Sequence, residues 1–119
     1  MHISKIKWGK IEIAEKKYHD ILVYGDTVEE RDYPKLKEYF DTSHEIGKWE
    51  VEKLFSNDPE VIIIGTGWFG IVKIPDGMKE EAEKKGIKLK ILKSNKAVSE
   101  YNKLIDSNKA VNALIHSTC

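Results

Sequence analysis

Strand-like and helical patterns alternate through the second half of the chain, and this alternation most restricts what the chain can fold into. Residues 61–64 form an aliphatic run typical of a strand buried on both faces. Strand-like patterns recur at residues 87–92 and 110–115, and a helical pattern precedes each of them. This order implies right-handed crossovers. We therefore expect the three strands to lie parallel in one sheet.

Capping residues and apolar stripes predict three helices. Ser43 is positioned to cap a helix that reaches roughly to Phe55. Asp76 is positioned to cap a second helix, which Gly86 would end. Ser94 is positioned to cap the third. The expected inner stripe of the third helix consists of Ala97, Val98, Tyr101, Leu104 and Ile105.

The first half of the chain has a strand-like pattern as far as Tyr24, with Gly9 and Gly25 as turns. We expect these strands to pair antiparallel and to complete a mixed sheet. Residues 26–41 are highly charged, and Pro34 argues against a helix running through their middle.

Composition favours a single domain over residues 1–119, because the chain is short and 40% of it is hydrophobic. Lys and Arg together number 20, as do Asp and Glu, so the formal net charge is zero. Nucleic-acid binders usually carry a basic excess, and their base and phosphate readers favour arginine. Arg31 is the only arginine here. We therefore expect no nucleic-acid partner.

Cysteine usage and hydropathy indicate a cytoplasmic protein. Cys119 is the only cysteine, which excludes an intramolecular disulfide and suits a reducing compartment. The N-terminal residues lack the apolar stretch of a signal peptide, and residues 61–64 are far too few to span a bilayer. We expect no membrane partner, and either a monomer or a homodimer.

Residues 65–70 spell the dinucleotide pattern G-x-G-x-x-G directly after a predicted strand. That motif requires a helix to begin at the glycines, so that its N-terminus holds the pyrophosphate. Here residues 71–75 are extended and end in a proline, and residues 87–93 lack the expected carboxylate. We therefore expect no cofactor. The motif is either a tight glycine turn or a backbone nest for a small anion or carboxylate.

Several unusual side chains would meet at the carboxyl edge of the parallel strands, where α/β sheets place their sites. The candidate ligand-binding residues are Ser43, His44, Thr66, Gly67, His116 and Cys119. In the alternative, structural interpretation, Ser43 caps a helix, His44 bonds to backbone and Cys119 packs as a small apolar group. No convincing catalytic set is present, and no close-spaced ligand pair predicts a metal.

Trp68 and Phe69 lie between glycines in the same loop. They either pack in the core or form an exposed aromatic pair that binds a partner protein.

The chain resembles a known family in five stretches, which are Thr42-Ser43-His44, residues 61–67, Gly86-Ile87, residues 97–104 and residues 113–119. Their order and spacing resemble the Mth-type domain family (the Mth nine-three-eight-like fold). Its relatives include an adipogenesis-associated protein and a mitochondrial assembly factor for respiratory complex I. The resemblance implies a compact three-layer α/β domain with a β-hammerhead-like excursion, which residues 26–41 would form.

The family resemblance implies no agreed enzymatic activity, so no catalytic residue carries over to this chain. We expect a non-enzymatic interaction or assembly module. The alternative is a protein that binds a small anion or carboxylate, or a minor enzyme, at the glycine-turn edge of the sheet. An apolar surface around Trp68 and Phe69 would favour the first, and a deep polar pocket the second.

Overall fold

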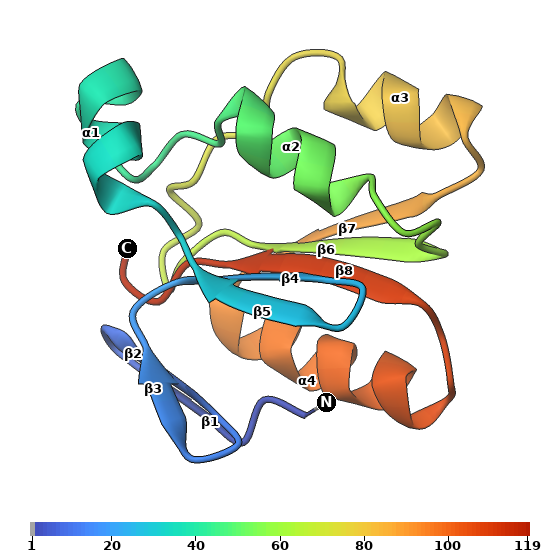
Figure 1. The fold of residues 1–119 in the computed structure, drawn as a ribbon, viewed down its shortest axis with the longest axis horizontal. Helices are drawn as coiled ribbons and strands as arrows, with labels where there is room; N and C mark the ends of the chain where they lie inside the picture. Colours follow the sequence, from blue (N-terminus) through green and yellow to red (C-terminus); the bar gives the residue numbers. More distant parts are fainter. Residues whose placement is uncertain (1) are drawn as a thin grey trace.

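A five-stranded mixed sheet forms the centre of the computed structural model, which describes residues 2–119 (Figure 1). The strands lie in the order β5-β4-β8-β6-β7. Their bounds are β4 Ile21–Tyr24, β5 Thr27–Glu30, β6 Val61–Gly65, β7 Lys88–Leu92 and β8 Val111–Ile115. β6 pairs in parallel with both β7 and β8, whereas β4 is antiparallel to β8 and β5. The predicted parallel arrangement of the three C-terminal strands is confirmed.

Helices and a second, small sheet cover the two faces of the central sheet (Figure 1). One face carries α2 (Lys48–Leu54) and α3 (Met78–Lys84), with α1 (Tyr33–Phe40) beside them. The other face carries α4 (Ser94–Asp106) and the antiparallel strands β1 (Lys5–Lys7), β2 (Lys10–Ile13) and β3 (Lys16–Tyr18). The three-layer α/β architecture is therefore as expected. Within residues 2–119, no helix is long and apolar enough to cross a membrane.

The core has two parts because the side chains of β6 alternate between the faces of the sheet. Ile63 packs on the α4 side, whereas Ile62 and Ile64 pack on the side of α2 and α3. All three are fully buried, as predicted for a strand covered on both faces. The expected inner stripe of α4 is also confirmed, since its members all belong to or pack against the cluster that contains Ile63.

Residues 26–41 differ from expectation, because they form β5 followed by α1. Pro34 lies in the first turn of α1, where its missing N–H would have no intrahelical partner. The Asp32 side chain caps this helix by accepting from the Lys35 amide at 3.1 Å. The separate small β layer is formed instead by residues 5–18. Of the N-terminal strands, only β4 and β5 join the mixed sheet.

The predicted N-caps are wrong for all three C-terminal helices. α2 begins after Gly47 rather than Ser43, because the Glu50 carboxylate accepts from the Gly47 amide at 3.0 Å and fixes the first turn there. α3 begins after Gly77 rather than Asp76. The residue at this cap has a φ of +83°, which glycine adopts more readily than aspartate does. α4 begins after Lys93, with Ser94 already helical. Gly86 follows the end of α3 at φ +69°, as expected for a helix-ending glycine.

Candidate functional site

The loop after β6 is held by the last residues of the chain. The Trp68 amide donates to the Thr118 carbonyl at 2.8 Å. The Phe69 and Ile71 amides donate to the Cys119 backbone oxygen at 3.0 and 3.3 Å. Three of the N–H groups that a backbone nest would offer to an anion, those of Trp68, Phe69 and Ile71, are therefore already bonded within the chain.

Gly67 explains why this loop is rich in glycine. Its φ is +100°, and a Cβ added there would lie 2.1 Å from the Cys119 carbonyl carbon. Its amide donates to the Ser94 hydroxyl oxygen at 2.8 Å, and that hydroxyl donates in turn to the His116 carbonyl. Residues 71–75 contain no helix, as expected from the sequence. The motif is a tight turn fitted to the C-terminal residues.

A buried acid–imidazole pair lies behind this turn. His116 Nδ1 is 2.7 Å from Asp20 Oδ2, and His116 Nε2 is 3.0 Å from the Thr118 hydroxyl oxygen. The other Asp20 oxygen accepts from the Ser117 amide at 2.7 Å. Burial alone would raise the pKa of Asp20, but the hydrogen bond and charge of His116, with the charge of Arg31, outweigh it and lower the pKa to about 2.

Arg31 joins this pair to the segment before α2. Its guanidinium binds both Glu50 oxygens, at 2.6 and 2.8 Å, and both side chains are fully buried. It also donates to the carbonyls of Ser43 at 3.0 Å and Glu45 at 2.8 Å, and lies 3.3 Å from Asp20. These bonds hold Ser43 in an irregular segment, which is why it does not cap α2. We call the cluster of Asp20, Arg31, Glu50, His116 and Ser117 the polar junction.

The structure brings most of the predicted ligand-binding residues into one neighbourhood, where their side chains and backbone groups mainly contact other parts of the protein. The His44 ring packs edge-on against His116, with ring centroids 5.4 Å apart. The carbonyls of His44 and Thr66 accept from the consecutive amides of Lys73 and Val72, at 2.8 and 3.1 Å. The Thr66 hydroxyl donates to the Leu92 carbonyl at 3.1 Å. Gly67, Thr66 and His116 are buried, whereas Ser43, His44 and Cys119 are half-buried.

The two aromatic residues of the loop take different roles. Trp68 is half-buried, and its Nε1 donates to the Ser117 carbonyl at 2.9 Å. Phe69 is 68% exposed and lies beside Trp8, which is 56% exposed, with ring centroids 6.0 Å apart. Ile71, in the same loop, is 45% exposed. We call Trp8, Phe69 and Ile71 the apolar flank.

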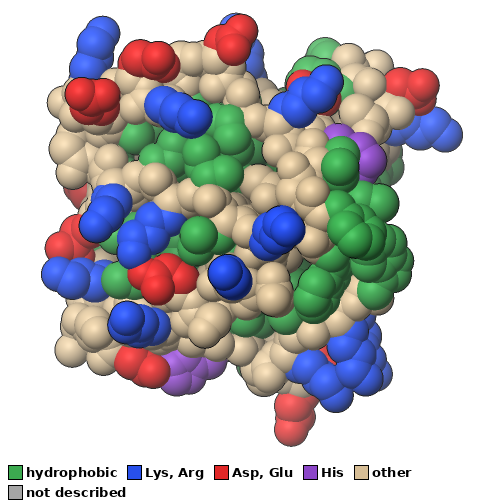
Figure 2. Space-filling model, turned by 180° about the vertical axis from the view of Figure 1, so that it is seen from behind, with side chains coloured by type: hydrophobic (Ala, Val, Ile, Leu, Met, Phe, Trp, Pro, Cys, Tyr) green, Lys and Arg blue, Asp and Glu red, His purple; other side chains and the backbone are tan. Residues whose placement is uncertain are grey.

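Hydrophobic side chains gather along the right-hand edge of the face in Figure 2. This is the side that carries β1–β3 and the C-terminus in Figure 1, since the two views differ by a half turn. The N-terminal hairpin is anchored there by the Gly9 amide, which donates to the Ser117 carbonyl at 3.0 Å. Trp8 lies in the turn of this hairpin and therefore contacts Phe69, although the two residues are far apart in the sequence. Sequence patterns alone gave no sign of this contact.

A basic face adjoins the apolar flank. In the three-stranded sheet, Lys5 lies opposite Glu12, Lys7 opposite Lys10, and Glu12 opposite Lys17. Because opposite residues share a face, these five side chains project from the side away from the core isoleucines. Four lysines and one glutamate leave a net charge of +3 (4 − 1). The neighbouring Lys5 and Lys10 lower the pKa of Lys7. We call this surface the lysine face.

Among residues 2–119, no three His, Cys, Asp or Glu side chains are grouped as metal ligands. At the glycine edge, by which we mean the loop of residues 65–70 and the C-terminal residues beside it, the polar groups mostly hydrogen-bond to one another. The exposed surface next to this edge consists of the apolar flank and the lysine face.

The sequence profile of one family, described as a protein of unknown function (DUF498/DUF598), matches residues 3–116. Among solved structures, the conserved hypothetical protein PH1505 from Pyrococcus horikoshii OT3 is 27% identical over the whole of both chains, with a TM-score of 0.79. MT938 is also 27% identical, covering 99% of this chain and 98% of its own, with a TM-score of 0.77. These matches confirm the family resemblance recognised in the sequence.

A more distant structure agrees in fold alone. A protein from Bordetella pertussis, described as a Mth938-like domain, is 14% identical. The match covers 98% of this chain and 85% of that one, with a TM-score of 0.62.

Proposed function

The chain belongs to the DUF498/DUF598 family of proteins of unknown function, and we propose that it is a non-enzymatic interaction module that docks a partner protein through the apolar flank. The exposed pair of Trp8 and Phe69 carries this proposal. Large aromatic side chains dominate the binding energy of protein interfaces, and here two of them meet on the surface from separate parts of the chain.

The internal bonding of the glycine edge supports the same function. A small anion at the loop would have to displace the backbone oxygens of Thr118 and Cys119 from the amides of Trp68, Phe69 and Ile71. The His116 side chain is fully buried and hydrogen-bonded to Asp20. A ligand site or a reaction at this edge would therefore require the C-terminal residues to move away first.

The lysine face indicates which kind of partner fits. Its net charge of +3 lies next to Trp8 in a chain whose total charge is zero. Complementary charge increases association rates and selects partners. A two-fold dimer centred on the flank would bring two lysine faces near each other, which like charges oppose. The partner we propose is a different protein that presents an apolar segment flanked by Asp or Glu. A reducing, cytosolic setting suits this module because Cys119 is a free thiol.

The test is selection from a display library of random peptides on the immobilised protein. We expect enriched peptides to combine acidic residues with Leu, Phe or Trp, and to bind more weakly as salt rises. The Trp8→Ala, Phe69→Ala double variant should lose about tenfold or more in affinity, because truncated aromatic hot spots cost about 2 kcal/mol or more.

Tyr39→Ala provides the matched control, because Tyr39 is 63% exposed but lies on α1. It should leave peptide binding unchanged. Peptides without acidic residues, or peptides that bind the double variant as well as the wild type, would contradict the proposal. Self-association that the double variant abolishes would identify a homodimer instead.

A further inference from the structure

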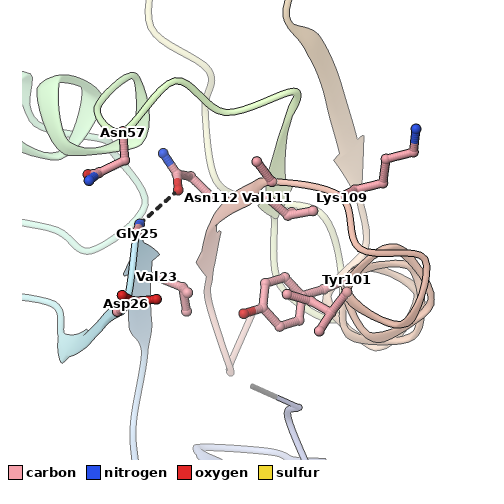
Figure 3. A pocket seen from close by; sticks show the side chains of 10 residues that line it. Val23, Gly25, Asp26, Asn57, Tyr101, Lys109, Val111 and Asn112 are labelled. Atoms are coloured by element: carbon pink, nitrogen blue, oxygen red, sulfur yellow. Dashed lines mark hydrogen bonds between the residues drawn. The ribbon is translucent and has the colours of Figure 1, made fainter.

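A cavity lies at the end of the sheet away from the glycine loop, where β4 ends and β8 begins. Its volume is about 300 Å³, within the range of small-ligand pockets. α4 closes one side of it through Tyr101 and Ile105. Val23 and Val111 supply apolar walls from the sheet, and Asp26 lies in the turn after β4 (Figure 3). The glycine edge and the apolar flank contribute nothing to this cavity.

Tyr101 carries the one open polar group among the buried side chains of this cavity. The side chain is 2% exposed, yet its hydroxyl makes no hydrogen bond within residues 2–119, and burial alone raises its pKa to about 12. Figure 3 shows the hydroxyl turned toward the strand that carries Val23. Among residues 2–119, the only fully buried side-chain nitrogen or oxygen without a partner is Trp49 Nε1, so the Tyr101 hydroxyl is not sealed off and remains open to the cavity. An open hydroxyl can donate a hydrogen bond to a ligand or accept one from it.

The neighbouring Asn112 shows the contrast. Its Oδ1 accepts from the Gly25 amide at 3.2 Å, and its Nδ2 donates to the carbonyls of Leu54 and Ser56 at 2.8 and 2.7 Å. This amide is bonded entirely within the protein and is unavailable to a ligand. The polar groups left for a ligand are the Tyr101 hydroxyl and the charges at the mouth of the cavity.

The charges at the mouth favour a cation. Asp26 is exposed and forms no ion pair within the part of the chain that the structure describes. The Lys109 ammonium points away from the cavity in Figure 3, and it lies 4.0 Å from Glu60. A carboxylate and a phenolic oxygen therefore face a space with aliphatic walls. That combination matches an ammonium group on a short hydrocarbon chain and opposes an anion of the same size.

We propose that this cavity binds a small primary amine, with its ammonium group at Asp26 and the Tyr101 hydroxyl and its aliphatic part against Val23, Ile105 and Val111. The site is independent of the proposed docking surface, because the two share no residue.

The probe is n-butylammonium, titrated into the isotope-labelled protein and followed by NMR. Saturable shifts should centre on residues of the cavity, with a dissociation constant of about millimolar for a ligand of so few atoms. Butyrate, the matched anion, and butanol, the matched neutral molecule, should not bind. Asp26→Asn should weaken binding about tenfold, as expected for a lost charge-assisted bond.

Tyr101→Phe keeps the ring and removes only the hydroxyl, so it should weaken amine binding several-fold while the protein remains folded. Asp76→Asn, which changes a carboxylate outside the cavity lining, is the control and should bind as the wild type does. The absence of saturable shifts with n-butylammonium would overturn the proposal. So would butyrate binding of equal strength, or unchanged amine affinity in Asp26→Asn.

Discussion

The two ends of the central sheet differ in how completely their polar side chains are bonded within the chain. Beyond the carboxyl end of β8, the polar junction pairs every charge it buries, and Arg31 alone reaches two carboxylates and two carbonyls. At the amino end of β8, the Tyr101 hydroxyl has no partner within residues 2–119. Groups that satisfy one another hold a structure in place, whereas an unsatisfied one leaves a position for a ligand. Clustered histidines and acids are thus a poor guide to the site in this protein.

The largest expected effect comes from breaking the polar junction at its centre. Arg31→Met would leave Glu50 and Asp20 buried without their cation, and it should reduce the free energy of unfolding by about 3–5 kcal/mol. Urea unfolding measures this effect. Lys37→Met, at an exposed position of α1, is the control and should change the stability by less than about 0.5 kcal/mol. A similar small loss in Arg31→Met would show that the junction is not what stabilises this end.

The fit between Gly67 and the C-terminal residues gives the next effect. Gly67→Ala should cost about 2–3 kcal/mol, because an added Cβ would overlap the Cys119 backbone and the φ of +100° is unfavourable for alanine. Gly9→Ala is the matched control, since Gly9 has a φ of +75° but no atom within 4 Å of an added Cβ. It should cost about 1 kcal/mol. Equal melting temperatures for the two variants would contradict the close contact.

The low pKa of Asp20 predicts a defined dependence of stability on pH. The pKa is lowered from 3.8 to about 2, so between these values the unfolded chain binds more protons than the folded one. The stabilisation from Asp20 is therefore complete above about pH 4 and is lost as the pH falls through 2, with a total of roughly 2 kcal/mol. Urea unfolding at a series of pH values tests this, and Asp20→Asn should remove that part of the acid dependence. An unaltered profile in this variant would assign the dependence to other groups.

The smallest expected effect is at the other end of the sheet. Tyr101→Phe should change the stability by less than about 0.5 kcal/mol, because the lost hydroxyl leaves no hydrogen-bond partner behind among residues 2–119. Tyr33→Phe is the comparison, since the Tyr33 hydroxyl bonds to His19 Nδ1. That variant should lose about 1 kcal/mol in a thermal unfolding experiment. If Tyr101→Phe lost more than Tyr33→Phe, the contrast between the two ends would fail.

The sequence predicted what depends on local repetition. The strands of the parallel sheet, the inner stripe of α4 and the turn at Gly86 were all indicated by residue spacing. The caps were missed at Ser43 and Asp76 because a tertiary contact or a glycine φ overrode the side-chain preference.

The polar junction was missed because its members are distant in sequence. Asp20 and His116 are 96 residues apart, and no spacing rule joins them. One signal was available, since a single arginine among so many lysines indicates a site that needs a bidentate, permanently charged group. The same reasoning applies to the docking surface, where Phe69 was named from the sequence and Trp8 was not.

The order of strands has a consequence for synthesis on the ribosome. β8 is the last of the described strands to be made, yet it lies between β4 and β6. Until it emerges, the β4–β5 hairpin and the β6–β7 pair have no hydrogen bonds to each other, and each presents an open edge. Such edges invite wrong pairing in a nascent chain. The sheet thus closes in one late step, when its middle strand is inserted.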